Sequence, residues 1–408
     1  MTRSLGSVPF VLIDDARPHY ARPQGEQPHG GGRPVMLYRD PAERIEARSI
    51  AQVRPALDRV RQAQQRGLHA AGFLSYEAGL ALEERLGRLD TRLREDDPPL
   101  LWFGLFETAE PLSDAQMADL LGEGQARGVQ AAPLIDRAAY ERAFAAVRER
   151  IVAGDIYQAN LTFPCHVAVG GDPLAFYRTV RPWAAAGHGA LVFTGDHWLL
   201  SFSPELFFSL EGRDLTTRPM KGTALRDADP ARDAAHAREL ASDPKQRAEN
   251  LMIVDLLRND LSRIAEPGSV AVPHLFTVES YPTVHQMVST VTGRLAEGLR
   301  AVDALEALFP CGSITGAPKI RAMEIIHEVE RSPRGPYTGS IGVIDAQGDA
   351  LFNVAIRTIC VKDGADIGVI GLGSGLVVDS VAANEWHECL DKGRFLSSPQ
   401  AGGDDERG

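Results

Sequence analysis

The sequence predicts an α+β fold in which half-buried strands are combined with amphipathic helices. Short strand patterns mix with helical patterns in the N-terminal third, and longer strands with strict polar and apolar alternation follow in the larger second part. A period of two indicates a strand with one face in the core, whereas apolar residues three and four apart indicate a helix. Both periods occur along the chain, so we expect sheets and helices in the same protein.

The composition is that of a folded protein and limits what it binds. The 408 residues suffice for a large core, and length alone suggests two or three domains of about 100–200 residues. Hydrophobic residues make up 44% and charged residues 24% of the chain, which excludes wholesale disorder. With 43 basic and 55 acidic residues the net charge is −12, so we expect no nucleic-acid binding. An anionic substrate would need local positive charge.

The spacing of the four cysteines and the length of the apolar segments indicate in which cellular compartment to expect the protein. The cysteines show no C-x-x-C spacing, so the sequence predicts neither a disulfide framework nor a zinc site. No run of about 18 apolar residues occurs, and the first residues lack the apolar core of a secretory signal. We therefore expect a cytoplasmic protein that does not enter a membrane.

The N-terminal part contains three predicted strands and one predicted helix. The strands are 10–13, 34–38 and 100–106, and the helix places Ile50, Val53, Leu57 and Val60 on one face. We predict a division into residues 1–130, 131–400 and a disordered tail at 401–408. By composition, residues 21–34 are a flexible loop and 125–135 a linker.

The second part opens with a predicted helix over 137–153, and four alternating strands follow. Each strand carries one conspicuous polar or charged side chain on its non-core face. The strands are 156–163 with Gln158, 201–210 with Glu205, 217–223 with Lys221 and 353–361 with Arg357. Polar strand faces usually meet solvent. Single functional groups among Ser, Thr and Asn favour the lining of a cleft instead.

Acidic side chains on two predicted helices are candidate metal ligands. Glu249 begins a helix over 249–263, and Glu385 and Glu388 share a face of a helix near the C-terminus. Mg²⁺ prefers oxygen ligands and usually takes one or two protein carboxylates. From the residues alone, an ordinary i,i+4 ion pair of Glu388 with Lys392 is the favoured interpretation of that side chain.

Two glycine-rich segments and the reactive side chains give weaker signals. Residues 371–375 lack the following helix of a dinucleotide site, so we predict a loop whose backbone N–H groups approach an anion. Residues 312–319 lack the Gly-Lys-Ser/Thr ending of a phosphate loop, and Pro318 fits the first turn of a helix through 323–329. No cysteine lies in a nucleophile elbow, and no histidines show metal-ligand spacing.

Several segments taken together resemble the chorismate-utilising enzymes, and within them the aminodeoxychorismate synthase component I group most closely. The matching segments lie in the family's order within about residues 140–395: 154–162, 203–205, 218–223, 247–255, 313–319, 356–358 and 375–380. The N-terminal part resembles the family more loosely. The resemblance implies two large antiparallel sheets packed face to face with helices outside. It also implies Mg²⁺-dependent chemistry on chorismate.

The resemblance also implies a role for each candidate residue. Glu249 and Glu388 would hold Mg²⁺, and Glu385 would be an outer carboxylate. Glu205 would protonate the departing C4 hydroxyl, and Arg357 would pair with a substrate carboxylate in a bidentate way. The remaining residues would line the substrate pocket: Gln158, Thr223, Thr315, Gly316, Lys319, Tyr337, Gly373 and Gly375.

Two positions favour one group within the family. Relatives that add water carry a lysine base where this chain has Gln158, and anthranilate synthases carry alanine where it has Lys221. In aminodeoxychorismate synthases, this lysine attacks C2 to form a covalent adduct, and ammonia then enters at C4. Deprotonating a lysine at pH 7 costs about 5 kcal/mol, which desolvation and a nearby cation would reduce. The alternative role for Lys221 is anion steering, together with Arg213, Arg218 and Arg226.

The chain also departs from its relatives. Gln246 stands where a carboxylate is frequent, Gln286 where a histidine is frequent, and Cys311 and Ser374 replace glycines. The segment 12–15 lacks the serine that relatives use to hold tryptophan.

The predicted function is therefore amination of chorismate to 4-amino-4-deoxychorismate in 4-aminobenzoate and folate synthesis. Ammonia would come from a separate glutamine amidotransferase subunit. Two alternatives remain, an anthranilate synthase component I and a non-catalytic chorismate-binding partner of an amidotransferase.

Overall fold

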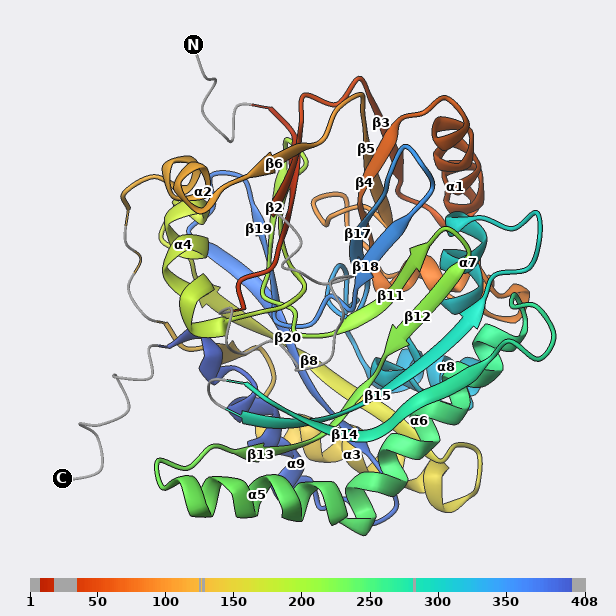
Figure 1. The fold of residues 1–408 in the computed structure, drawn as a ribbon. Helices are drawn as coiled ribbons and strands as arrows, with labels where there is room; N and C mark the ends of the chain where they lie inside the picture. The colour runs from red at the N-terminus through yellow and green to blue at the C-terminus, as the bar shows by residue number, and fades with distance from the viewer. Residues whose placement is uncertain (1–7, 18–34, 125, 127–128, 282–283, 398–408) are drawn as a thin grey trace.

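The computed structural model describes residues 8–17, 35–124, 126, 129–281 and 284–397. Two antiparallel sheets of ten strands each dominate it, with helices around them (Figure 1). The α+β prediction with two large antiparallel sheets is confirmed. The predicted loop 21–34 and tail 401–408 lie outside the described residues.

The first sheet contains the longest strand pair of the fold, β8 with β20. Its order is β16 (Gly316–Ala317), β8 (Gln158–Ala168), β20 (Ile367–Leu376), β19 (Thr358–Lys362), β10 (His197–Ser201), β9 (Gly189–Phe193), β1 (Phe10–Asp14), β2 (Val35–Arg39) and β6 (Glu110–Leu112). The short β7 (Ala132–Pro133) also pairs with β8.

The second sheet has a long strand, β15, near one end. Its order is β13 (Met220–Leu225), β15 (Val284–Arg294), β12 (Asp214–Arg218), β11 (Leu206–Glu211), β18 (Ala350–Asn353), β17 (Ser340–Ile344), β4 (His69–Leu74), β5 (Leu101–Phe106) and β3 (Glu43–Ala47). On the other side of β15 lies β14 (Ala271–Ser280). Each sheet therefore takes strands from both sides of residue 130.

The two sheets pack face to face through an apolar layer. One buried cluster joins Val11, Val192 and Leu199 of the first sheet to Phe73 and Trp102 of the second. The alternate residues of the same strands face outward, as Leu101, Phe103 and Leu105 of β5 do in a second, larger cluster. The period of two seen in the sequence thus places one set of side chains between the sheets.

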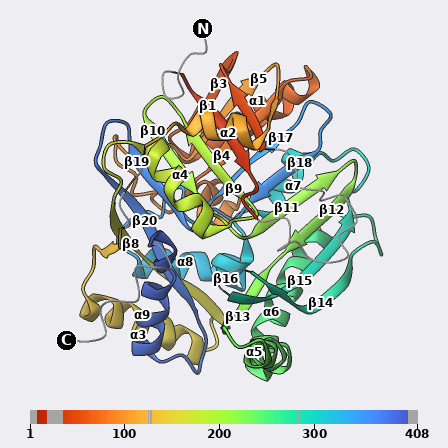
Figure 2. The same cartoon turned by 60° about the vertical axis from the view of Figure 1, so that its left-hand side comes forward.

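Helices cover the outer faces of the sheets (Figures 1 and 2). Their bounds are α1 (Ile50–Gln65), α2 (Asp114–Leu121), α3 (Arg137–Val152), α4 (Pro173–Ala184), α5 (Pro230–Ser242), α6 (Pro244–Ser262), α7 (Ala301–Leu308), α8 (Lys319–Val329) and α9 (Ala382–Asp391). Helix α1 packs on β3–β5, α5 and α6 pack on β13–β15, and α3 and α9 pack on β20. None of the described helices is long and apolar enough to cross a bilayer.

Three of the predicted strands are not continuous, because each corresponds to two separate strands. The predicted strand 201–210 is β10 of the first sheet followed by β11 of the second, and 353–361 is β18 of the second followed by β19 of the first. The predicted strand 217–223 is interrupted at Pro219, which has no N–H to give to a ladder, and becomes β12 and β13. Polar and apolar residues still alternate in the sequence on both sides of each break, because each flanking strand buries its own apolar residues.

The loop predicted at 371–375 is also wrong. These residues belong to β20, and Gly371 through Gly375 pair with Pro164 through Asn160 of β8. Leu372 and Ser374 are buried. The glycines are explained by close neighbours, since a Cβ at Gly373 would lie 2.6 Å from Leu161 O.

Candidate active site

Two chain segments cross side by side from one sheet to the other, and each carries a candidate residue. Residues 202–205 lead from β10 to β11, and residues 354–357 lead from β18 to β19. Phe202 N donates to Arg357 O over 3.0 Å, and Val354 N donates to Glu205 O over 3.0 Å. Backbone hydrogen bonds thus hold Glu205 and Arg357 at the place where the two segments pass from one sheet to the other.

Glu205 is a buried carboxyl group with one hydroxyl partner. Glu205 is only 4% exposed, and Ser313 Oγ donates a hydrogen bond to its Oε1 over 2.8 Å. Burial raises the pKa of Glu205 to about 7, against the opposing effects of the Ser313 hydrogen bond and the charge of Lys221. Such a carboxyl group can give up a proton near neutral pH.

Arg357 presents a desolvated guanidinium group. Its backbone is in the left-handed region with φ of 51°, and its guanidinium carbon lies 5.5 Å from the centre of the Phe395 ring. Burial lowers its pKa, and among the described residues no carboxylate forms an ion pair with it. A guanidinium group in this setting favours an anionic ligand.

The side-chain nitrogens of Lys221 and Gln158 both lie close to Gly375. A Cβ built on Gly375 would lie 3.0 Å from Lys221 Nζ and 3.3 Å from Gln158 Nε2. The Gln158 side chain is fully buried, and neither of its polar atoms has a hydrogen-bond partner in the structure. Because buried amides are normally bonded, this unpartnered amide makes Gln158 a candidate contact for a polar ligand.

The charges around Lys221 come from several elements. Burial lowers the pKa of Lys221, and the charge of Lys392 lowers it further, whereas Glu249, Glu205 and Glu388 raise it. The net shift is downward, which increases the fraction of neutral amine.

The carboxylates of Glu249 on α6 and Glu388 on α9 interact through their charges. Burial raises the pKa of Glu249, and the negative charge of Glu388 adds to that rise. Burial opposes ionisation of Glu388 too, but Lys392, whose Nζ lies 2.8 Å from Oε1, holds the pKa of Glu388 below its usual value. The predicted i,i+4 ion pair is therefore confirmed. Glu385, one turn earlier, is buried.

The donor set fits Mg²⁺. The described residues contain no group of three or more His, Cys, Asp or Glu side chains able to hold a metal by themselves. Two carboxylates from two helices suffice, because Mg²⁺ usually fills its remaining positions with water and substrate oxygens.

Other predicted substrate residues have partners inside the protein. Thr315 Oγ1 donates to Cys311 O over 2.8 Å, and Thr223 Oγ1 donates to Gln286 Oε1 over 2.9 Å. Lys319 Nζ lies 2.6 Å from Asp260 Oδ2 and donates to Leu308 O. Gly316 has φ of 148°, and a Cβ there would lie 2.3 Å from Gln158 O. Gly316 thus allows the close approach of β16 to Gln158.

Tyr337 lines a different pocket. It is buried beside Gly371 of β20, and the pocket also includes Tyr140, Thr162 and Phe163. Neither Lys221 nor Gln158 lines this pocket. The structure thus separates Tyr337 from the space around Lys221, and its substrate role stays a prediction.

One partner of a candidate residue and one buried arginine beside β8 had no signal in the sequence. Ser313 was part of a matching segment, but nothing indicated that its hydroxyl group binds Glu205. Arg334 is 9% exposed and ties β8 to the turn before β16, because its guanidinium donates to Asn160 O and Ile314 O and pairs with Glu330. Such contacts depend on long-range packing that no local pattern shows.

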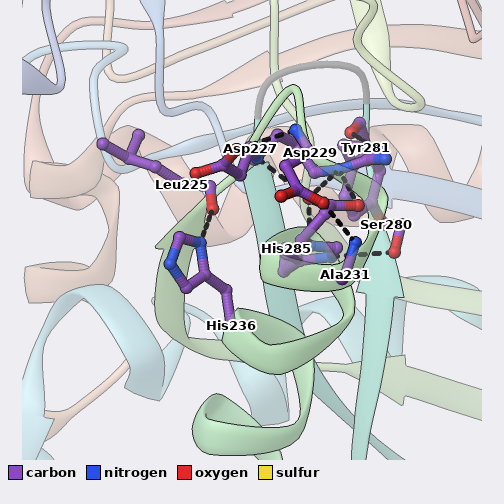
Figure 3. A network of polar contacts seen from close by, with 10 residues as sticks. Leu225, Asp227, Asp229, Ala231, His236, Ser280, Tyr281 and His285 are labelled. Carbon is purple, nitrogen blue, oxygen red and sulfur yellow. Dashed lines mark hydrogen bonds and ion pairs between the residues drawn. The ribbon is translucent and has the colours of Figure 1, made fainter.

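Helix α5, beside β13, is attached by a polar network (Figure 3). Asp233 Oδ1 accepts from Arg226 Nε over 2.8 Å and lies 2.9 Å from His285 Nε2, while His285 Nδ1 lies 2.8 Å from Ser280 Oγ. Arg226 is therefore engaged by Asp233, as Arg213 is by Glu266 and Arg218 by Glu279, so each of the three arginines considered for anion steering has an acidic partner.

Comparisons with known proteins give matches in both sequence and structure. A family model described as chorismate binding enzyme matches residues 14–398. Aminodeoxychorismate synthase component 1 of Klebsiella aerogenes is 45% identical over 258 residues, which cover 63% of this chain and 57% of that protein. Anthranilate synthase component 1 of Streptomyces coelicolor is 41% identical over 325 residues, covering 79% of this chain and 60% of that protein. The matches thus span less than two thirds of either relative.

A solved structure shows the same fold. The crystal structure of anthranilate synthase component I from Streptococcus pneumoniae superposes with a TM-score of 0.78 at 29% identity, covering 90% of this chain and 93% of that one. The family model and the fold comparison therefore both reach nearly the whole described chain.

Proposed function

The chain belongs to the family of chorismate-binding enzymes, and on this basis we propose that it aminates chorismate at C4 to give 4-amino-4-deoxychorismate. The observation that carries the proposal is Lys221. Its amine lies beside Gly375 and the unpartnered amide of Gln158, with its pKa lowered by burial. A neutral amine in this position can act as a nucleophile.

In the first step, the Lys221 amine attacks C2 of chorismate. The new C–N bond forms as both double bonds of the ring diene shift and the bond from C4 to its hydroxyl group breaks, and the lysine nitrogen of the adduct keeps its two protons as a secondary ammonium. Glu205 gives its proton to that hydroxyl group, which leaves as water. A pKa of about 7 keeps much of Glu205 protonated at neutral pH, as a general acid requires.

In the second step, ammonia adds at C4. Both double bonds shift back, the bond between C2 and the lysine nitrogen breaks to release the neutral amine, and a proton from the incoming ammonia restores the neutral acid at Glu205. The net reaction consumes chorismate and ammonia and forms 4-amino-4-deoxychorismate and water.

The charged groups of the site account for binding of the anionic substrate. Arg357 would pair with a substrate carboxylate, since its guanidinium has no acidic partner among the described residues. Glu249 and Glu388 would hold Mg²⁺. When bound, this cation neutralises the ring carboxylate.

We propose that ammonia comes from a glutamine amidotransferase subunit, because both relatives named above are first components of synthases. The folate-precursor pathway and the cytoplasmic location stay predictions. The N-terminal segment gives no support for a tryptophan site: the Asp14 carboxylate there accepts hydrogen bonds from Arg181 and Tyr177.

The test is incubation of the purified chain with chorismate, Mg²⁺ and ammonium, with products identified by mass. We expect 4-amino-4-deoxychorismate without release of pyruvate. Without ammonium, intact-protein mass spectrometry should show an adduct of chorismate less one water. Lys221→Ala should abolish the adduct, whereas Lys362→Ala, at an exposed lysine paired with Asp96, should keep it.

The second candidate is anthranilate synthase component I, favoured by the 41% identity to the Streptomyces coelicolor protein over a longer stretch. Lys221 argues against it, because the resemblance places alanine there in anthranilate synthases. Formation of anthranilate with pyruvate would overturn the amination proposal. No turnover with any nitrogen source would favour a non-catalytic chorismate-binding protein.

A further inference from the structure

The residue that follows Lys221 sits in a bulge of β13. Met220 pairs with Val288 and Thr223 with Gln286, so three steps along β13 match two steps along β15. The extra residue falls at Lys221–Gly222, and Gly222 has φ of 83°. A bulge re-aims the side chains next to it and leaves local backbone groups without ladder partners.

Gln286 of β15 supplies the missing partner. Its Nε2 donates to Gly222 O over 2.8 Å, and its Oε1 accepts from Thr223 Oγ1 over 2.9 Å. The Gly222 carbonyl fixes which end of the amide faces it, because only the nitrogen end can donate to a carbonyl, and the threonine hydroxyl group donates to the oxygen end. One side chain thus binds the two residues that follow Lys221.

Gln246 of α6 closes the other side of the bulge. A Cβ on Gly222 would lie 2.9 Å from Gln246 Oε1 and 3.2 Å from Leu240 Cδ1. The two glutamines that depart from the family pattern therefore meet at the same peptide, next to Lys221. Both are neutral at every pH, so neither glutamine adds a titrating group to the bulge.

We propose that Gln286 is a positioning residue that holds the bulge of β13 so that Lys221 Nζ points into the space beside Gly375 and Gln158. This inference rests on the proposed function of Lys221 as the nucleophile. Without the Gln286 amide, Gly222 O loses its partner and the flexible Lys221–Gly222 backbone can turn. Covalent attack requires close alignment, so even a small displacement of Nζ slows it.

The experiment measures the rate and the final amount of Lys221 adduct formed from chorismate and Mg²⁺ without ammonia. Gln286→Met keeps the length of the side chain but neither of its hydrogen bonds. We expect the rate to fall about tenfold or more, with the chorismate concentration for half-maximal rate little changed. Thr292→Val is the matched control, because it removes a polar group from the same face of β15 away from the bulge and should leave the rate unchanged.

Two further variants separate the hydrogen bond from packing. Gln286→Glu keeps the shape of the side chain but cannot donate to Gly222 O, so it should slow the adduct as Gln286→Met does. Gln286→His retains a ring N–H and should restore part of the rate. If Gln286→Met or Gln286→Glu forms the adduct at the wild-type rate, the proposal is wrong.

A readout independent of turnover is trace acylation of the free protein with acetic anhydride, followed by peptide mass spectrometry. Gln286→Met should change the labelling of Lys221 several-fold relative to Lys362 in the same molecule, and unchanged labelling would contradict the proposal. Absence of an adduct in the wild-type protein, with Lys221 labelling sensitive to Gln286, would overturn the proposed function but support the positioning of Lys221.

Discussion

Ser313 Oγ donates a 2.8 Å hydrogen bond to Glu205 Oε1, and both residues are buried. Because a hydroxyl donor stabilises the ionised carboxylate, this bond opposes the rise in pKa that burial causes. The proton that Glu205 donates would therefore be carried by its other oxygen.

Replacing Ser313 should move the alkaline limb of the pH profile. Loss of the hydroxyl group raises the pKa of Glu205 beyond about 7. A general acid acts only while protonated, so activity in Ser313→Ala should persist to a pH about one unit higher. The measurement is kcat/KM for chorismate between pH 6 and pH 9. Ser75→Ala, at a buried serine that donates to Pro99 O, should leave the limb in place, and an unmoved limb in Ser313→Ala would contradict the assignment of Glu205.

Glu205 should also make stability depend on pH. Its pKa is raised from 4.5 to about 7 in the folded state, so its contribution is fully present below pH 4.5 and is lost as pH rises through 7. Glu205→Gln cannot ionise and should be more stable than wild type at pH 8, by at most about 3 kcal/mol. At pH 4 the two should be alike. Urea unfolding at both pH values measures this difference, and equal stabilities at pH 8 would show that Glu205 is not buried as described. Turnover in the variant should fall at least about a hundredfold.

Arg357 should govern affinity more than rate. Arg357→Lys keeps the positive charge but not the two parallel N–H groups that match a carboxylate. We expect the dissociation constant for chorismate to rise about tenfold to a hundredfold. Calorimetric titration of both proteins would measure it. Unchanged affinity, with Phe395 still packed on the side chain, would place the substrate carboxylate elsewhere.

Glu249 and Glu388 should set the requirement for magnesium. Replacing either by glutamine removes a negative charge from the pair, so the Mg²⁺ concentration for half-maximal activity should rise at least about tenfold. Glu328→Gln, at a half-exposed glutamate of α8 near Arg150, is the matched control. Equal Mg²⁺ dependence in all four proteins would exclude Glu249 and Glu388 as ligands.

The sequence predicted strands in these segments but neither their breaks nor the sheets to which they belong. Alternation around Glu205 and Arg357 looked continuous, because each flanking strand contributes its own buried residues. Only the pairing of Leu206 with Asn353 and of Ser201 with Thr358 shows that both segments pass between sheets. Such pairings join residues about 150 positions apart, and no local pattern records them.

The site was predictable where a motif fixed a residue type and less so where contacts define the role. Gln158, Lys221 and Gly375 meet as the family pattern implies. Lys319 and Thr223 belong to equally well-matched segments, yet their polar groups bind Asp260 and Gln286. Gln286 stood out in the sequence only as a departure, and its contact with Gly222 became visible once β13 and β15 were paired.

The central strands of both sheets come from the last part of the chain. In the first sheet, β20 and β19 lie between β8 and β10, and in the second, β18 and β17 lie between β11 and β4. While the protein is still on the ribosome and lacks residues beyond β15, the strands β8, β10, β11 and β4 each have an open edge. Open edges of this kind promote aggregation. Successful production of the enzyme therefore depends on how the nascent chain is protected until its final quarter emerges.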